Sequence, residues 1–403
     1  MRACVVFVLA NCAFVFSSAQ NVRSVKKNRI DNQYNDLQEE INYINSGGEF
    51  INDDKHYNRV HLHHHNHRPH HHHHQQQNQI TGFENAHSFD DNREQYPGVE
   101  RFDNDAKLRF FYSSMENYTE LPLNRANDIF AKSWYNSSKT TVFFAHGYTG
   151  HPNGPAIVSV INAYLKYGDH NVVLLNWDKM AAGYPPTLAS TYVNYAMPNA
   201  RKLGVHFANI LFDLSHSGMN LNRTHLIGHS LGAHIFGIAG NSLLERKIQL
   251  PWITALDPAA YGFENRPSSA QLSARSAIFV SVIHSDPSKY GFSKALGTVD
   301  FWPNYKNGPV IQPGCFNRAS AMFSQRDLCN HNRSWELLID SLKYPGSLVG
   351  SYAPNFRKWK NYSVSERNAN TLSIGVYDAN ATKGNYFLQT NAESPYGRGN
   401  DGL

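Results

Sequence analysis

The stretch that decides the fold is residues 224–234, which read THLIGHSLGAH. Its first four residues are typical of a buried strand, and a run rich in small residues follows that favours a helix. Gly228 and Gly232 flank Ser230 at the spacing that a tight strand-to-helix turn requires, because glycine lets the neighbouring backbone come close. Such a turn exposes the serine hydroxyl at the carboxyl end of the strand. We therefore predict that Ser230 is a nucleophile, provided that the surrounding chain supplies the rest of a site.

Apolar runs alternate with helical patterns from about residue 100 onward. The predicted strands are residues 141–145, 171–177, 224–227, 252–256 and 278–283. The predicted helices are residues 155–167, residues 192–214 and a segment that begins at Leu231. Regular alternation of this kind indicates an α/β fold with a mostly parallel central sheet and helices on both of its faces.

Two further motifs lie where predicted strands end. The residues HGY at 146–148 follow the strand 141–145, and Asp257 follows the strand 252–256. After a nucleophile turn, one oxyanion donor comes from the loop after such an earlier strand and the other from the residue that follows the serine. We expect the backbone amides of Tyr148 and Leu231 to form this oxyanion hole. Asp257 is placed to orient a catalytic imidazole and to stabilise it when charged.

The histidine of this site has two candidates. His331, in the sequence CNH at 329–331, gives the chain order serine, aspartate, histidine that accompanies the nucleophile turn. His284 follows the predicted strand 278–283 and is the rival, which we interpret as a packed histidine near the site. The expected catalytic residues are therefore Ser230, Asp257 and His331. Chemistry of this type requires no metal and no organic cofactor.

The first 98 residues have a different character. Arg2, an apolar run and the small residues 17–19 form the pattern of a secretory signal peptide, predicted as residues 1–19. Asn, Gln, Asp, Glu and His dominate residues 20–98, which we predict to be disordered, and the folded domain is expected at residues 99–403. The histidine tract at 61–74 is open to two interpretations, a metal-binding or pH-responsive segment and a disordered insertion, and we favour the second.

Charge and cysteine usage agree with a secreted globular protein. The net charge of the 403 residues is +5 without any Lys/Arg block, which argues against nucleic-acid binding. Cys4 and Cys12 belong to the predicted signal peptide, so the mature chain keeps Cys315 and Cys329, an even pair suited to an oxidising compartment. No later segment is long and apolar enough to predict a membrane span. Candidate N-glycosylation sites are Asn117, Asn136, Asn222, Asn361 and Asn380.

At these motifs the chain resembles the pancreatic-lipase-like family of α/β-hydrolases, also called neutral lipases, over roughly residues 100–400. It is most similar to the short insect members and to the phospholipases that cleave the sn-1 ester. The residues that carry the resemblance are HGYTG (146–150), NW (176–177), 225–234, LDPA (256–259), GTVDF (297–301), QPGC (312–315), CNH (329–331) and NAESPYG (391–397). The chain departs from the family pattern at Ser276 and Ser281, where relatives tend to carry aspartates, and in its long polar leader.

The resemblance implies a disulfide between Cys315 and Cys329 that closes a short lid loop. A short lid, together with a short stretch after His284, accompanies phospholipid or galactolipid hydrolysis in relatives. The implied function is a secreted lipase or phospholipase that cleaves acyl esters at a lipid–water interface. The alternative is a lipase-fold protein without activity, of the kind that serves in eggs as a yolk storage protein or lipid carrier.

Overall fold

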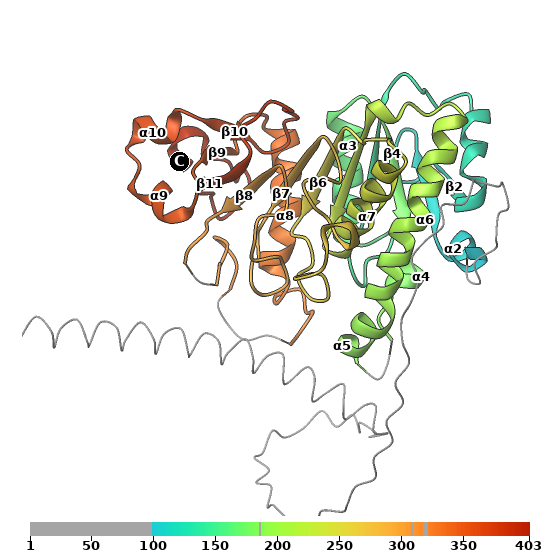
Figure 1. Cartoon of the computed structure of the whole chain (residues 1–403), viewed down its shortest axis with the longest axis horizontal. Coiled ribbons are helices and arrows are strands. Elements are labelled where there is room, and N and C mark those ends of the chain that lie inside the picture. Colours follow the sequence, from blue (N-terminus) through green and yellow to red (C-terminus); the bar gives the residue numbers. More distant parts are fainter. Residues whose placement is uncertain (1–98, 185–186, 308, 317–320) are drawn as a thin grey trace, which may run out of the picture. The chain divides into compact units, whose positions relative to one another are not determined.

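A single eleven-stranded sheet organises the folded part of the chain. The computed structural model describes residues 99–184, 187–307, 309–316 and 321–403, so the predicted signal peptide (1–19), the predicted disordered segment (20–98) and its histidine tract lie outside the described residues. The strands lie in the order β10-β9-β11-β8-β7-β6-β5-β3-β4-β1-β2 (Figure 1).

The sheet is parallel through its centre and antiparallel at both edges. Its parallel strands are β3 (Thr140–Ala145), β4 (His170–Asn176), β5 (Thr224–His229), β6 (Trp252–Leu256), β7 (Phe279–Ile283), β8 (Val299–Pro303) and β11 (Gly384–Leu388). The antiparallel strands are β1 (Lys107–Phe111), β2 (Tyr118–Pro122), β9 (Val349–Tyr352) and β10 (Thr371–Ser373). The predicted mostly parallel sheet is confirmed. The strands predicted from the sequence correspond to β3, β4, β5, β6 and β7. The edge strands, β8 and β11 were not predicted.

Helices cover both faces of the sheet because its central strands are apolar on both sides. In β3, Phe143 and Ala145 belong to one core and Val142 and Phe144 to the other, as the alternation of side chains along a strand requires. The helices α6 (Met197–His216) and α7 (Leu231–Glu245) pack into the first core, and α3 (Pro155–Tyr167) and α8 (Cys329–Lys343) pack into the second (Figure 1).

The predicted helices are observed with small differences. The segment 155–167 forms α3 as predicted, and the segment 192–214 begins as a π-helical turn before it continues as α6. The short helices are α2 (Val99–Asp105), α4 (Asp178–Ala181), α5 (Leu188–Thr191), α9 (Phe356–Asn361) and α10 (Val364–Asn368). The π-helical turn is η2 (Tyr192–Ala196), and the 3-10 helices are η1 (Leu123–Ala131), η3 (Leu221–Arg223), η4 (Ser268–Ala270) and η5 (Gly399–Gly402). Among the described residues, no helix has the length and apolar content that crossing a bilayer requires.

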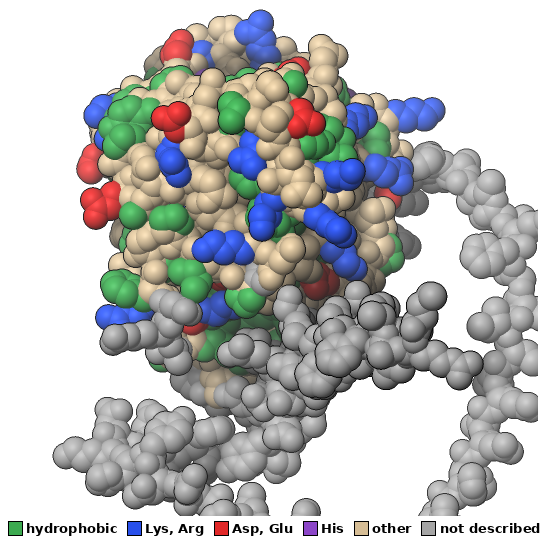
Figure 2. All heavy atoms as spheres, turned by 90° about the vertical axis from the view of Figure 1, so that its left-hand side faces the viewer, with side chains coloured by type: hydrophobic (Ala, Val, Ile, Leu, Met, Phe, Trp, Pro, Cys, Tyr) green, Lys and Arg blue, Asp and Glu red, His purple; other side chains and the backbone are tan. Residues whose placement is uncertain are grey.

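A small aromatic cluster attaches α9 to the β8–β11 end of the sheet. Trp302, Trp359 and Phe387 are buried together with Ala353. The outer side of α9 carries the exposed side chains Arg357, Lys358 and Lys360. Figure 2 views the molecule from this end, and lysine and arginine side chains are spread over the face that it shows.

We predict that Phe207 is needed to hold α6 on the sheet. Its side chain is fully buried and makes ring contacts with Phe143 on β3 at 5.8 Å and Phe236 on α7 at 5.5 Å. Phe207→Ala is expected to lower the free energy of unfolding by about 3–5 kcal/mol because it leaves a cavity there. Val205→Ala on the same helix, where the side chain is 53% exposed, is expected to change it by less than about 0.5 kcal/mol. Urea unfolding measures both, and similar losses in the two variants would contradict the prediction.

Candidate active site

The turn between β5 and α7 holds Ser230 in an unusual backbone conformation. Strand β5 ends at His229 and α7 begins at Leu231, so Ser230 alone makes the connection. Its φ of 56° and ψ of −116° lie outside the regions that a non-glycine residue ordinarily adopts. The turn is held by a hydrogen bond from the Ser230 amide to the Leu256 carbonyl at 3.0 Å. The serine therefore stands at the carboxyl end of β5, where the sequence predicted it.

Two glycines make this turn sterically possible. A Cβ atom on Gly232 would lie 2.2 Å from the carbonyl oxygen of Ala145, at the end of β3. A Cβ atom on Gly228 would lie 2.4 Å from the amide nitrogen of Ala233. Both neighbours are backbone atoms, which cannot swing away as a flexible side chain can. The first turn of α7 therefore lies directly against the end of β3.

Asp257 and His331 are joined by a short hydrogen bond. The His331 Nδ1 to Asp257 Oδ2 distance is 2.6 Å, and both side chains are buried. The other carboxylate oxygen of Asp257 accepts hydrogen bonds from the amides of Ser285 at 2.8 Å and Asp286 at 3.0 Å. The sequence carries no signal that marks these two amides as donors, although they follow a predicted strand at the same edge of the sheet. Their hydrogen bonds fix the carboxylate that faces the imidazole.

Burial has the largest influence on the pKa values of this pair. It raises the pKa of Asp257 above its ordinary value, while the hydrogen bonds from the Asp286 and Ser285 amides lower it. Burial also lowers the pKa of His331, and the positive charge of Lys289 acts in the same direction. At neutral pH the imidazole is therefore neutral. In the tautomer that carries its proton on Nδ1, the imidazole donates to Asp257 and keeps Nε2 as a proton acceptor.

His331 lies close to the serine turn. Its ring centroid lies 4.6 Å from the ring of His229, the residue directly before Ser230. Among the hydrogen bonds of the described residues, none joins the Ser230 hydroxyl to His331. Contacts between a nucleophile and its base are often long before substrate binds and shorten only in the complex.

The amides expected to form the oxyanion hole have no other partner. In the described part of the chain, neither Tyr148 nor Leu231 donates its backbone N–H to a backbone or side-chain acceptor. Leu231 is the first residue of α7, where helix geometry leaves N–H groups without an intrahelical acceptor. The Tyr148 loop is fixed by a hydrogen bond from the Thr149 amide to the Ala181 carbonyl at 2.7 Å. Neither amide is therefore engaged by an acceptor within the described residues.

The rival histidine is engaged elsewhere. His284 Nε2 lies 2.8 Å from Asp300 Oδ1, and Nδ1 lies 3.1 Å from the Phe292 carbonyl oxygen. Its ring stacks on Trp302 at 3.8 Å, and it is fully buried. Since both ring nitrogens have partners outside the pair of Asp257 and His331, His284 has a structural role beside the site.

An aromatic residue of the disulfide-closed loop lies next to the candidate site. The disulfide between Cys315 and Cys329 is present, which confirms the predicted pairing. In the loop that it closes, the ring of Phe323 contacts the rings of Tyr148 and Tyr290, each at 5.4 Å. Tyr290 in turn lies 5.5 Å from the ring of His331. No signal in the sequence singled out Phe323 or Tyr290, because their proximity depends on the path of the loop.

Within the described residues, no group of three or more His, Cys, Asp or Glu side chains is arranged to hold a metal ion. At the carboxyl edge of the sheet, the described residues place a serine hydroxyl, an imidazole–carboxylate pair and the backbone amides of Tyr148 and Leu231.

The sheet is mostly parallel, a serine turn follows β5 and an acid follows β6, and a histidine comes later in the chain. This arrangement is the α/β-hydrolase fold. The chain belongs to the lipase family, whose family model matches residues 74–396. This confirms the family that the sequence motifs predicted.

Two relatives illustrate the similarity. Lipase member H-B of Xenopus laevis is 32% identical over 231 residues, which are 56% of this chain and 46% of that protein. Phospholipase A1 of Vespa crabro is 30% identical over 263 residues, which are 64% of this chain and 83% of that protein. The chain thus spans about half the length of the lipase member H relatives that it matches.

We predict that Gly232→Ala disrupts the serine turn. Its Cβ atom would force the first turn of α7 away from Ala145, and such overpacking costs about 1–3 kcal/mol of unfolding free energy. The matched control is Ser242→Ala, a half-buried position on the same helix, where alanine is expected to be neutral or slightly stabilising because of its helix propensity. Urea unfolding compares the two, and equal stability of both variants would refute the role given to Gly232.

Proposed function

We propose that the protein is a secreted serine ester hydrolase that cleaves acyl esters of lipids, with residues 99–403 as its hydrolase domain. The observation that carries this proposal is the Asp257–His331 hydrogen bond of 2.6 Å beside a strained serine turn. The two unpartnered amides of Tyr148 and Leu231 supply the remaining requirement, a place for negative charge to develop. Further support is that the chain belongs to the lipase family.

The proposed reaction has two steps, acylation and deacylation. His331 removes the proton from the Ser230 hydroxyl as the oxygen attacks the ester carbonyl, and the amides of Tyr148 and Leu231 stabilise the tetrahedral oxyanion. His331 then protonates the leaving alcohol, and the C–O bond of the ester breaks. Water, deprotonated by His331, attacks the acyl-serine and releases a fatty acid and free Ser230. Asp257 stabilises the imidazolium in both steps.

We propose phospholipids as the substrate class, with cleavage at the sn-1 ester. The support is the similarity to phospholipase A1 of Vespa crabro, which covers most of that protein. The loop closed by Cys315 and Cys329 is short, with a sequence separation of 14 between the cysteines. A short loop leaves room for a bulky headgroup beside the scissile ester.

We also propose an extracellular location. The disulfide requires an oxidising compartment to persist. All five candidate glycosylation asparagines are exposed: Asn117, Asn136, Asn222, Asn361 and Asn380. The N-terminal signal pattern in the sequence supports the same location.

The direct test is covalent labelling of Ser230 by a fluorophosphonate ester. The Ser230 oxygen should attack phosphorus and expel fluoride, which adds the phosphonyl mass to the peptide that contains Ser230. Ser230→Ala should fold normally, resist labelling and lose roughly 10⁴-fold or more of its esterase activity. Ser242→Ala, a serine away from the site, should label like the unaltered protein. Absence of labelling in the well-folded, unaltered protein would reject the enzyme and favour the storage or carrier alternative.

The pH dependence of activity follows from the buried state of His331. Only the neutral imidazole accepts the serine proton, and burial holds its pKa below the ordinary value of 6.5. A lowered pKa keeps the base neutral to lower pH, so kcat/KM should stay constant through pH 6.5 and fall only in more acidic solution. A water-soluble nitrophenyl ester, assayed across the stable pH range, measures this. A midpoint above 6.5 would show that the charge of Asp257 outweighs burial.

A further inference from the structure

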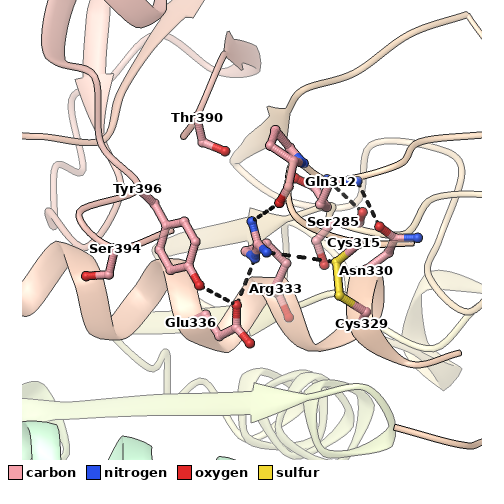
Figure 3. Close-up of polar contacts among 12 residues, drawn as sticks. Ser285, Gln312, Cys315, Cys329, Asn330, Arg333, Glu336, Thr390, Ser394 and Tyr396 are labelled. Carbon is pink, nitrogen blue, oxygen red and sulfur yellow. Dashed lines mark hydrogen bonds and ion pairs between the residues drawn. A yellow bond between two sulfur atoms is a disulfide. The ribbon is translucent and has the colours of Figure 1, made fainter. Parts of the chain in front are cut away.

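We propose that Gln312 is a positioning residue that aligns the Asp257–His331 pair by holding Ser285. This inference rests on the proposed function, because it assigns a residue to the same site. Gln312 belongs to the QPGC sequence at 312–315 and is fully buried. It lies on the segment between β8 and the disulfide, and Figure 3 shows it beside Ser285 and Asn330.

Ser285 is the residue through which Gln312 acts, because it touches both members of the pair. Its amide donates to Asp257 Oδ1 at 2.8 Å, and its hydroxyl donates to the His331 carbonyl oxygen at 3.2 Å. Its own carbonyl accepts a hydrogen bond from Gln312 Nε2 at 2.8 Å. A displacement of Ser285 would therefore change both the orientation of the carboxylate and the position of the histidine.

Every polar atom of the Gln312 side chain is used in this arrangement. The second Nε2 proton goes to the Pro303 carbonyl at 3.1 Å, and Oε1 accepts from Asn304 Nδ2 at 2.8 Å. The two carbonyl partners of Nε2 fix the orientation of the amide. If the amide were flipped, Oε1 would face the carbonyl oxygens of Ser285 and Pro303. The side chain thus connects the end of β8 with the segment after β7.

The Gln312 backbone reaches the histidine from a second direction. Its amide donates to Asn330 Oδ1 at 2.8 Å, and Asn330 directly precedes His331 in the first turn of α8. Gln312 therefore touches the residue before His331 and the residue that orients Asp257, without touching either catalytic side chain. A buried amide in this position supports the geometry of the pair and leaves substrate binding to other residues.

The test compares Gln312→Met, which keeps the size but donates no hydrogen bond, with the unaltered full-length protein. With a soluble nitrophenyl ester, kcat should fall about ten- to hundredfold while KM stays unchanged, since misalignment by about 1 Å is enough for losses of this size. Gln312→Asn keeps an amide and should lose less. If Gln312→Met does not fold, the kcat of Gln312→Asn is the deciding measurement. An unchanged kcat in that variant would overturn the proposal.

A matched control separates positioning from general loss of packing. Thr390 Oγ1 accepts a hydrogen bond from Asn304 Nδ2 at 2.8 Å, and the hydrogen bonds of Thr390 among the described residues include none to Ser285 or Asn330. Thr390→Val therefore removes this hydrogen bond and the one that the Thr390 hydroxyl donates to the Asn391 carbonyl at 3.3 Å, both one residue further from Ser285 than the bonds of Gln312. It should lower the unfolding temperature and leave kcat unchanged. An equal fall of kcat in Thr390→Val and Gln312→Met would overturn the positioning role.

A spectroscopic readout tests the inference independently of activity. The Nδ1 proton of an imidazole in a short hydrogen bond to a carboxylate resonates far downfield in the proton NMR spectrum. This signal should be present in the unaltered protein and in Thr390→Val, and it should move upfield or vanish in Gln312→Met. If the unaltered protein has no esterase activity but the signal changes in this way among the variants, the proposed function is rejected and the role of Gln312 is supported. An unshifted signal in Gln312→Met would overturn that role.

Discussion

The contact between Gly232 and the carbonyl of Ala145 is the constraint on which the site depends. It brings the first turn of α7 against the end of β3, so the serine turn with its Leu231 amide is held next to the Tyr148 loop. Without room for this approach, the helix would begin further from the sheet. On the proposed assignment, the amides would then point away from the place where an acyl oxygen becomes charged.

The site is assembled from two parts of the sheet that differ in how they hold their residues. Ser230 and the amides of Tyr148 and Leu231 are fixed by backbone geometry, in the turns that follow β5 and β3. Asp257 and His331 are instead fixed by hydrogen bonds among buried side chains and loop amides that follow β6, β7 and β8. Since a buried polar group left without a partner costs about 1–3 kcal/mol, the second part keeps its arrangement only while every member of the network is satisfied.

This difference explains how far the sequence could predict the structure. Ser230, Asp257 and the central strands carry local signals, because buried parallel strands are continuous apolar runs and the serine turn needs glycines at fixed positions. His331 could be chosen over His284 only through chain order, and the structure shows the two nitrogens of His284 occupied. Gln312 and Phe323 could not be assigned roles, because their partners lie on segments that meet only in the fold. The edge strands β1, β2, β9 and β10 are only partly buried, so they lack the continuous apolar runs of the central strands.

The order of the site residues along the chain has a consequence for biosynthesis. Ser230 and the oxyanion amides belong to segments that leave the ribosome well before α8, which carries His331. Strand β11, which pairs with β8 beside the segment that contains Gln312, comes later still. On the proposed assignment, a growing chain therefore presents a serine without its base, and this serine stays unreactive during translation. The capacity to attack esters would arise only after α8 has emerged and joined the fold, so a partly synthesised chain would leave the surrounding lipids intact.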